Sequence, residues 1–599
     1  MVYQLKILSS KKESIIAVRQ PDNLLETLHS HHYSLPSICG GNQSCGQCKI
    51  KVLEGDLKLT DAEIDMLSRK EINKDIRLAC CHKINGYLKI SLPEYNKINI
   101  LTKSSEVDIE LNPSIKRKII NPVNSSIEKQ TDLLTILKEN NTWFNCIKIN
   151  LLNKLPNLST ERKTAAVVNQ GEIIDFQRVD HTSGVYGFAL DIGTTTVVMY
   201  LVNLLSGKEV DVISFANPQK EQGADVISRI NYTQKNKEGL KNLQQKIING
   251  LNTAIDKILK KNNIKKNNIY QISIVGNTIM LHFLLGVSAE KMAKSPYIPV
   301  FTEELNLDPG DLDLNINKNA VIKLHPSISS YIGADIVADI TATDYENYRY
   351  SLLIDIGTNG EIVLFKDDKI YACSAAAGPA FEGAGIRYGS AGVPGAVAAF
   401  DENGYHTIAD QPPHGICGSG LLDIVCYLLE KNYIDKNGAF NKKENLSKPK
   451  QKRLLQYKGK PAFIVVDSEE TANSEALILT QKDIREFQLA KGAVAAGIEI
   501  LIKKAGIQTS DIERLYLAGG FGNYINIENA KKVGLIPNML TANAVKMGNG
   551  AGLGAKIYLL NLDKANEASE TSTKIEYVEL SKIKLFQKYF MDNMLFNMI

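Results

Sequence analysis

Four cysteine residues near the start of the chain constrain its fold more tightly than any other feature of the sequence. Cys39, Cys45 and Cys48 lie together in the string CGGNQSCGQC, and Cys80 follows in RLACC. Three thiolates on one loop and a fourth on a distant turn are the ligand set of a [2Fe–2S] cluster. The spacing therefore predicts an iron–sulfur site with a small domain folded around it.

The spacing C-x5-C-x2-C also helps to decide whether the four thiolates would hold an iron–sulfur cluster or a zinc ion. Zinc ribbons usually carry two separated C-x2-C pairs, and this chain has only one such pair. We therefore favour a cluster over a zinc site. The loop is one residue longer than that of plant-type ferredoxins, and it resembles the loop of the vertebrate and bacterial ferredoxins that serve hydroxylase systems.

Cys80, Cys81 and His82 are adjacent, so the fourth ligand has to be chosen among neighbours. Adjacent side chains on an extended backbone face opposite ways, and only one of the two cysteines can point into the loop. The closing motif RLAC favours Cys80. A Rieske-type centre needs two histidine ligands, and the loop already supplies three cysteines, so we expect His82 to lie on the surface.

The pattern of apolar and polar segments divides the 599 residues into four parts. Residues 1–95 begin and end with strand-like runs and predict a small α+β domain of the β-grasp-like ferredoxin kind. Residues 96–125 are polar, contain two prolines and predict a linker. Residues 126–183 predict a small middle domain, and residues 184–599 alternate strands with helices, as an α/β domain does.

Two segments of the last part repeat one plan. FALDIGTTTVVMYLV begins at Phe188 and LLIDIGTNGEIVLF begins at Leu352, and each has an apolar strand, an Asp-Ile-Gly-Thr turn and a second strand. The repeat predicts a duplicated fold in two halves with a cleft between them.

Each of these turns offers groups that suit phosphate, since backbone N–H groups and hydroxyls gather at a close approach of the chain. We expect the two aspartates to organise Mg²⁺ and its waters, and the other residues to bind phosphates. The residues concerned are Asp191, Gly193, Thr194, Thr195 and Thr196 in the first copy and Asp355, Gly357, Thr358 and Asn359 in the second. Either turn alone is also found in ordinary hairpins, whereas the pair indicates a polyphosphate held from two sides.

A third element, LYLAGGFGNY, places Gly519 and Gly520 after an apolar strand, where adenosine can pack on the backbone. A Walker A motif is absent from the sequence. The three elements, in this order, resemble the superfamily of actin, sugar kinases, acetate kinase and Hsp70-type chaperones over about residues 184–599. The resemblance implies an actin-like ATPase fold.

Four further strings resemble one branch of that superfamily, the reductive activators of corrinoid proteins, and with the cysteine loop the resemblance covers essentially the whole chain. The strings are NPQKEQGADVISRI (217–230), VGNTIMLHFLLG (275–286), AAAGPAFEGAGIRYG (375–389) and GICGSGLLD (415–423). The resemblance implies reduction of the inactive Co(II) corrinoid of a methyltransferase system to Co(I), with ATP, Mg²⁺ and a [2Fe–2S] cluster. It also implies a corrinoid protein as partner, an external low-potential donor (a ferredoxin or a reductase) and a homodimer as one assembly.

Composition and charge indicate which partners and which location the protein is expected to have. A formal net charge of +4 over this length is no polybasic footprint, so nucleic acid is not expected as a partner. The N-terminus lacks the apolar core of a secretory signal, and no apolar run approaches the roughly 18 residues of a membrane span, so we expect a cytoplasmic protein without membrane insertion.

Three rival interpretations remain beside the corrinoid activator. The first is a nucleotide-binding scaffold that senses redox state without ATP-driven electron delivery. The second is an ATP-dependent activator of another low-potential metalloenzyme, such as a radical dehydratase, but that family lacks an N-terminal ferredoxin loop. The third is a ferredoxin reductase, which the absence of a GxGxxG fingerprint after the early strands disfavours.

Overall fold

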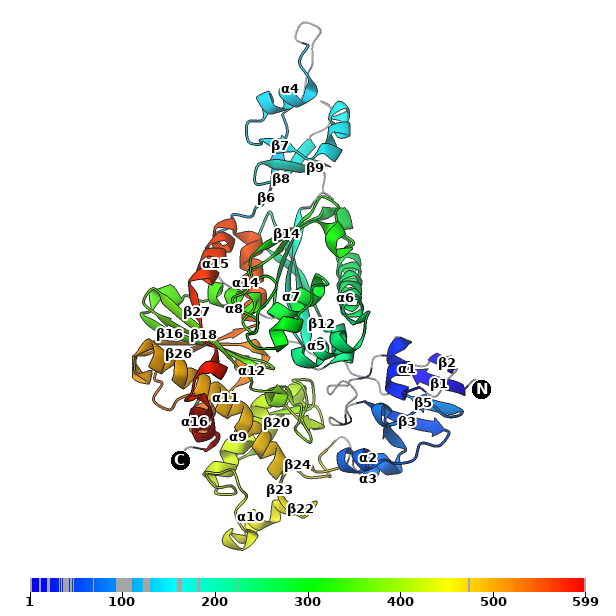
Figure 1. Cartoon of the computed structure of the whole chain (residues 1–599), viewed down its shortest axis with the longest axis vertical. Coiled ribbons are helices and arrows are strands. Elements are labelled where there is room, and N and C mark those ends of the chain that lie inside the picture. The colour runs from blue at the N-terminus through cyan, green and yellow to red at the C-terminus, as the bar shows by residue number, and fades with distance from the viewer. Residues whose placement is uncertain are drawn as a thin grey trace.

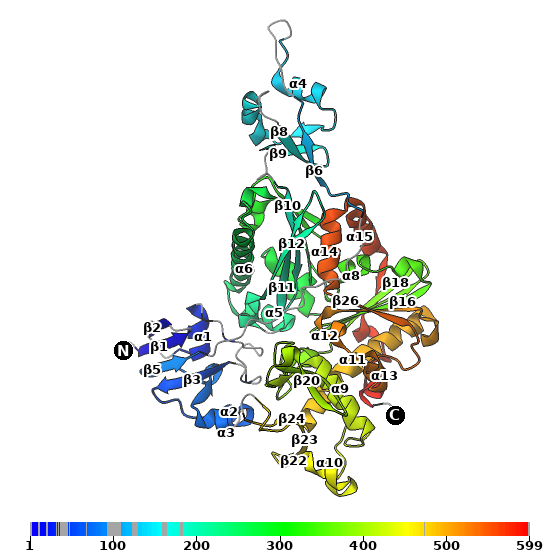
Figure 2. The same cartoon turned by 180° about the vertical axis from the view of Figure 1, so that it is seen from behind.

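The computed structural model describes the chain from Tyr3 to Phe596 with gaps, and Figures 1 and 2 show it from two opposite sides. Outside the described part lie residues 1–2, 10–11, 19–21, 32, 34, 36–42, 44–45, 47, 68, 93–109, 122–129, 159–163, 180–183, 224, 472–473 and 597–599. The described residues form an N-terminal domain, a small middle domain and two large lobes, and the two largest hydrophobic cores lie in the lobes.

The N-terminal domain is a five-stranded mixed sheet with short helices, the β-grasp-like arrangement expected from the sequence. In the order β2-β1-β5-β3-β4, its strands are β1 (Tyr3–Ser9), β2 (Lys12–Val18), β3 (Lys49–Glu54), β4 (Ile76–Leu78) and β5 (Leu88–Ser91), with helices α1 (Leu24–Ser30), α2 (Asp61–Met66) and α3 (Arg69–Asn73). Leu5 and Ile7 alternate with polar residues along β1, and both are fully buried. Burial of this face fixes the register of the sheet.

The middle domain is a four-stranded sheet that begins earlier in the chain than the sequence suggested. Its strands, in the order β6-β8-β9-β7, are β6 (Ile115–Ile119), β7 (Cys146–Ile147), β8 (Thr164–Asn169) and β9 (Glu172–Arg178), with helix α4 (Leu133–Asn140). β6 lies inside the range expected to be a linker. Its sequence, IKRKI, has too few apolar residues to show a period, and the strand is held by antiparallel pairing with β8.

The first lobe is built on a six-stranded sheet in the order β12-β11-β10-β13-β15-β14. The strands are β10 (Tyr186–Ile192), β11 (Thr196–Asn203), β12 (Glu209–Ala216), β13 (Ile269–Gly276), β14 (Leu305–Leu307) and β15 (Val321–Leu324). The helices between them in sequence are α5 (Val226–Lys235), α6 (Gly239–Lys261) and α7 (Thr278–Leu284), and α8 (Ala334–Thr341) follows. β13 is buried along its whole length, as a central strand covered on both faces should be.

The second lobe carries another six-stranded sheet, in the order β26-β25-β16-β17-β18-β27. Its strands are β16 (Tyr350–Ile356), β17 (Gly360–Lys366), β18 (Lys369–Ala375), β25 (Arg514–Ala518), β26 (Asn543–Gly548) and β27 (Ile575–Tyr577). Its helices are α9 (Gly418–Glu430), α10 (Lys448–Lys452), α11 (Gln481–Ala505), α12 (Gly519–Tyr524), α13 (Ile527–Lys532) and α16 (Phe586–Met594). Two small sheets complete the lobe: β19 (Ala396–Asp401), β20 (Gly404–Thr407) and β21 (Gly415–Ile416), and β22 (Leu454–Tyr457), β23 (Lys460–Val466) and β24 (Leu477–Thr480).

The two large sheets repeat one topology, which agrees with the repeat in the sequence. In each, three strands form an antiparallel meander, β10-β11-β12 in the first lobe and β16-β17-β18 in the second. The first strand of each meander then pairs in parallel with a later strand, β13 or β25. Both Asp-Ile-Gly-Thr turns consequently lie at equivalent strand ends.

Helices from the end of the chain return to the first lobe. α14 (Gly550–Leu560) packs on α8, β10 and β13, and α15 (Leu562–Lys574) follows it. A Cβ atom at Gly554 would lie 2.2 Å from the carbonyl oxygen of Ala338, so the backbones of α14 and α8 are nearly in contact. The chain therefore crosses from β26 of the second lobe back into the first lobe, where α14 is closely packed.

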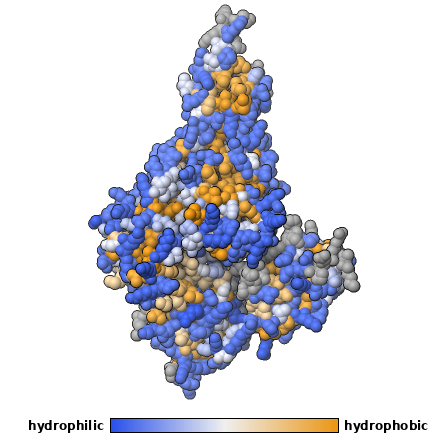
Figure 3. Space-filling view, in the orientation of Figure 1, coloured by the Kyte–Doolittle hydropathy of each residue, from blue (hydrophilic) through white to orange (hydrophobic). Residues whose placement is uncertain are grey.

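Polar surface predominates on the face shown in Figure 3, with hydrophobic residues in several small patches. Of the helices that the structure describes, none combines the length and the apolar character that crossing a membrane requires.

One lysine is buried against the end of the chain. Lys491 of α11 is 1% exposed, and its Nζ atom donates a hydrogen bond of 2.5 Å to the carbonyl oxygen of Leu595. It also lies 5.2 Å from the centre of the Phe596 ring. Burial lowers the pKa of Lys491 to about 7.

We expect Lys491→Met to raise thermal stability near neutral pH and to flatten its pH dependence. The unfolded chain holds this proton up to about pH 10.5 and the folded chain releases it from about pH 7, so the wild type gains stability as the pH rises between these values. The slope has an upper limit of about 1.4 kcal/mol per pH unit. Melting curves across this window, with the exposed Lys482→Met as control, measure both effects; a variant as pH-dependent as the wild type contradicts the prediction.

Candidate nucleotide site and iron–sulfur site

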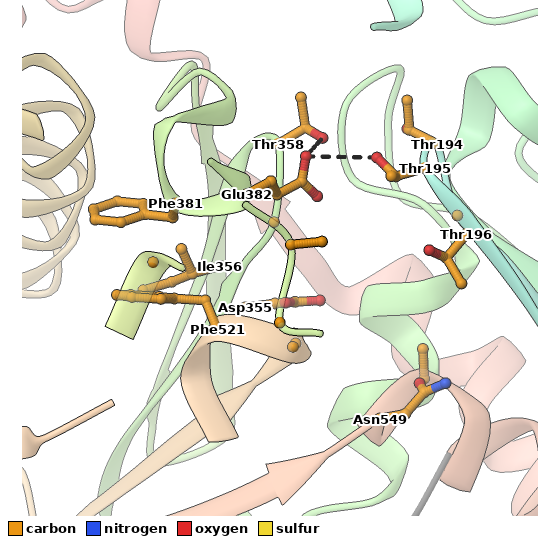
Figure 4. A pocket seen from close by; sticks show the side chains of 18 of the residues that line it. Thr194, Thr195, Thr196, Asp355, Ile356, Thr358, Phe381, Glu382, Phe521 and Asn549 are labelled. Carbon is orange, nitrogen blue, oxygen red and sulfur yellow. Dashed lines mark hydrogen bonds between the residues drawn. The ribbon is translucent and has the colours of Figure 1, made fainter. Parts of the chain in front are cut away.

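A cavity of about 370 Å³ lies between the two lobes and contains the residues that the sequence suggested for a nucleotide. Asp191, Gly193, Thr194, Thr195 and Thr196 line it from the first lobe, and Asp355, Gly357, Thr358, Asn359, Gly519 and Gly520 line it from the second. Figure 4 shows the threonines of the two turns facing each other across this space. The structure thus brings together eleven residues from three separate motifs.

Local hydrogen bonds shape the two Asp-Ile-Gly-Thr turns, here termed the phosphate loops. The N–H group of Gly193 donates to the carbonyl oxygen of Thr196 at 2.9 Å, and that of Gly357 donates to Asn359 at the same distance. These tight turns join antiparallel strands in register, with Asp191 opposite Val198 and Asp355 opposite Glu361. The residues of both turns, Thr194 to Thr196 in the first and Gly357 to Asn359 in the second, line the cavity.

Two glycines allow the backbone to approach the buried carboxylates. Gly519 has a φ of +79°, and a Cβ atom there would lie 2.3 Å from Oδ1 of Asp355. A Cβ atom at Gly550 would lie 2.2 Å from Oδ1 of Asp339. Larger residues would collide with the acidic side chains, so these positions require glycine.

Four carboxylates in the cavity were not assigned from the sequence. They are Asp335 and Asp339 on α8, Glu361 on β17 and Glu382 at the end of the short 3₁₀ turn η8 (Pro379–Glu382). Asp335 and Asp339 are four residues apart on a helix and so share one face. The sequence feature that could have revealed these two aspartates is their spacing within the mostly apolar string ADIVADIT.

The crowding of acids raises their pKa values. Burial, strengthened by the neighbouring aspartates, raises the pKa of Asp191 to about 7 and that of Asp335 to about 8. Burial likewise raises the pKa of Asp355 to about 6, while the pKa values of Asp339 and Glu361 lie well above their usual range. A cation placed among these groups would relieve their mutual repulsion.

Asp339 points most directly to a cation. Its side chain is fully buried, and among the described residues its carboxylate has no donor and meets only another carboxylate, that of Asp355. Oxygen-rich, acidic surroundings suit Mg²⁺. Within the described ranges, however, no three acidic, histidine or cysteine side chains converge closely enough to hold a metal ion. The residues fit an ion that keeps several of its waters and is shared with phosphate.

The other end of the cavity is apolar. The rings of Phe381 and Phe521 stack with their centres 4.4 Å apart and an interplanar angle of 21°. Tyr524, at the end of α12, also lines the cavity and is 59% exposed. Aromatic surface beside Gly519 and Gly520 suits a purine ring, so the cavity has an acidic end for phosphates and an apolar end for a base.

The candidate iron–sulfur site lies in the N-terminal domain. The Sγ atoms of Cys48 and Cys80 are 3.3 Å apart, and both residues are nearly fully buried. The N–H group of Cys80 approaches the Sγ atom of Cys48 at 3.5 Å. A pair of thiols with a backbone N–H directed at sulfur fits the environment of a cluster. Cys39 and Cys45 lie outside the described residues.

The expectation that His82 lies on the surface is wrong. His82 is 7% exposed, and its Nε2 atom lies 2.7 Å from Oε1 of Glu63, which is itself fully buried. Glu63 also completes a capping box with Thr60 and accepts a hydrogen bond from the N–H group of Leu78. Burial alone would raise the pKa of Glu63, but hydrogen bonds, led by that from His82, hold it below its usual value. A buried carboxylate needs such donors, and this need draws His82 inward.

Fold and sites together define a two-lobed protein of the actin-like kind with an attached iron–sulfur domain. Residues 8–85 match the 2Fe-2S iron-sulfur cluster binding domain, residues 186–348 match the RACo middle region, and residues 349–598 match the C-terminal domain of RACo, the ASKHA domain.

Whole-chain comparisons agree with these matches. The corrinoid activation enzyme RamQ of Eubacterium limosum is 31% identical over 606 residues, which cover 99% of each chain. The [Co(II) methylated amine-specific corrinoid protein] reductase of Methanosarcina barkeri is 24% identical over 68% of this chain and 76% of that protein. A solved structure, the reductive activator for corrinoid,iron-sulfur protein, is 28% identical, with a TM-score of 0.74 and coverage of 99% of this chain and 98% of that one. The chain belongs to the family of corrinoid activation enzymes.

We predict that Cys80→Ser abolishes the [2Fe–2S] absorption and EPR signals, whereas Cys81→Ser preserves them. The Sγ atom of Cys80 lies 3.3 Å from that of Cys48, whereas the Sγ atom of Cys81 contacts that of Cys80 at 3.9 Å, so Cys80 is the neighbour that extends the Cys48 site. Iron content, visible absorption and EPR of the reduced proteins measure the outcome. The prediction fails if both variants retain the signals, or if Cys81→Ser alone loses them.

Proposed function

We propose that this protein returns a corrinoid protein to its methyl-accepting state by reducing the cobalt from Co(II) to Co(I) in an ATP-dependent reaction. The observation that carries the proposal is the 31% identity to a corrinoid activation enzyme over the full length of both chains. The presence of a nucleotide cavity and paired buried cysteines in one chain supports it.

Energetics explain why such a reaction needs a nucleotide. Plant-type [2Fe–2S] centres have potentials near about −400 mV, and each roughly 59 mV of uphill one-electron transfer costs about 1.4 kcal/mol. Transfer to a cobalt centre of still lower potential requires another source of free energy. ATP can provide it only if its binding or hydrolysis differs between two states of the complex.

The residues divide this work between two places. Cys39, Cys45, Cys48 and Cys80 would hold the cluster, which supplies a one-electron carrier when bound. Asp191 and Asp355, with Asp335 and Asp339 beside them, would hold Mg²⁺ and its waters. The phosphates would bind to the residues of the two turns, and adenosine would pack on Gly519 and Gly520. The turn residues are Gly193, Thr194, Thr195, Thr196, Gly357, Thr358 and Asn359.

A surface ion pair joins the iron–sulfur domain to the second lobe. The Nζ atom of Lys458, between β22 and β23, lies 2.9 Å from Oδ1 of Asp65 and 3.0 Å from the carbonyl oxygen of the same residue. Both side chains are well exposed, and exposed ion pairs contribute little to stability. Such a contact suits a domain that docks on the lobes and departs to meet a partner.

Two further parts of the proposal concern partners. No GxGxxG fingerprint follows the early strands, and we propose that electrons come from an external low-potential donor, a ferredoxin or a reductase. The family resemblance also suggests a homodimer.

The decisive assay is anaerobic. Purified protein is mixed with a Co(II) corrinoid protein and a low-potential reductant, with and without Mg-ATP, and Co(I) is followed by its absorption. We expect Co(I) to accumulate only with Mg-ATP. If ATP binds but makes no difference with every corrinoid protein tried, the nucleotide-sensing scaffold becomes the better interpretation.

Asp191→Asn separates the two sites. We predict that this variant loses ATP-dependent formation of Co(I) by at least about tenfold, because Asp191 lies among the cavity's carboxylates and far along the chain from the cysteines. Its cluster absorption and EPR signals should match those of the wild type. Loss of those signals would show that the two sites do not act separately.

A further inference from the structure

One carboxylate links the two phosphate loops. Oε2 of Glu382 accepts a hydrogen bond of 2.9 Å from the Thr358 hydroxyl and another of 3.5 Å from the Thr195 hydroxyl. Thr195 belongs to the first lobe and Thr358 to the second, and Figure 4 shows Glu382 between them. A single oxygen atom therefore joins the lobes at the place where both loops offer their hydroxyls.

A terminal phosphate would need the same donors. Each threonine hydroxyl has one proton to donate, and here both protons are directed at one carboxylate oxygen. A phosphate bound between the loops accepts from these hydroxyls only if Glu382 releases them. An ionised Glu382 carboxylate and a phosphate bound between the loops would also repel each other, more strongly in a partly closed cavity than in water.

The turn that carries Glu382 also contacts the apolar end of the cavity. In η8, the residue before Glu382 is Phe381, which is 3% exposed and stacks on Phe521 of α12. Phe381 also meets Phe487 of α11 edge to face, with ring centres 5.7 Å apart. A shift of Glu382 is thereby connected to the segment beside the base and to the long helix of the second lobe.

We propose that Glu382 is a clasp between the lobes that competes with the terminal phosphate of a nucleoside triphosphate for the hydroxyls of Thr195 and Thr358. A triphosphate opens the clasp and frees η8 from the loops, whereas a diphosphate, which lacks the group at this position, leaves it closed. Glu382 is thus a positioning residue that distinguishes ATP from ADP. The inference rests on the proposed function for its nucleotide and extends it to the response that the nucleotide causes.

The test compares affinities for Mg-ATP and Mg-ADP in the full chain by equilibrium dialysis. Glu382→Gln removes the competing charge, and we expect it to bind ATP about tenfold more tightly, which corresponds to about 1.4 kcal/mol, while ADP affinity changes less than about twofold. Glu382→Asp keeps the charge and should not tighten ATP binding. Glu469→Gln, an exposed glutamate of the same lobe that does not line the cavity, should leave both affinities unchanged.

Several outcomes would overturn the clasp. Equal changes for ATP and ADP, weaker binding of both in Glu382→Gln, or tightening by Glu382→Asp would each show that Glu382 does not compete with the terminal phosphate. Unchanged affinities with slower ATP hydrolysis would make it a group that acts on the attacking water instead. Thermal melting of each variant confirms that it is folded, and Glu382→Asp preserves the test if the amide does not fold.

The affinities do not depend on the corrinoid reaction. Failure of the proposed function would appear as no ATP-dependent Co(I) in the wild type, and the ATP and ADP affinities would still test the clasp. Failure of the clasp alone would leave Co(I) formation in the wild type intact with an unchanged ATP/ADP affinity ratio in Glu382→Gln.

Discussion

The crowding of carboxylates between the two lobes is the constraint on which the rest of the large domain depends. Six acidic residues from both lobes line one cavity, and burial together with mutual repulsion raises their pKa values. Such a set is tolerable only where protons or cations offset the charge. The fold therefore needs protons or cations at the point where its halves meet.

Close backbone packing holds this arrangement in place. α8 carries Asp335 and Asp339, and it is fixed by α14, whose Gly554 approaches the carbonyl of Ala338 so closely that a side chain there would collide. At the start of α14, Gly550 lies against Asp339 in the same manner. A helix from the end of the chain therefore sets the position of acids that lie about two hundred residues earlier.

The sequence predicted the parts that local pattern determines. The repeated strand–turn–strand motif placed Asp191 and Asp355 at equivalent strand ends, and parallel pairing of β16 with β25 brings Gly519 beside Asp355. The sequence did not predict Asp339 as a site residue, because its role arises from packing between distant segments. The burial of His82 was not predicted, because its partner Glu63 has the sequence pattern of an ordinary helix-capping residue. β6 escaped because a short, mostly charged strand acquires its structure only from its neighbour β8.

The separation of the two sites limits how a nucleotide can assist electron transfer. The paired cysteines lie in a domain that meets the second lobe through an exposed ion pair, whereas the acidic cavity lies between the lobes. A nucleotide in that cavity cannot tune the thiolates by contact, so it must act through the relative position of the lobes and of whatever they hold. Nucleotide binding can assist electron transfer only if two arrangements of the lobes bind the nucleotide with different affinities. A group shared between both phosphate loops, as Glu382 is, lies where that inequality can arise, because it responds to the terminal phosphate and joins both lobes at once.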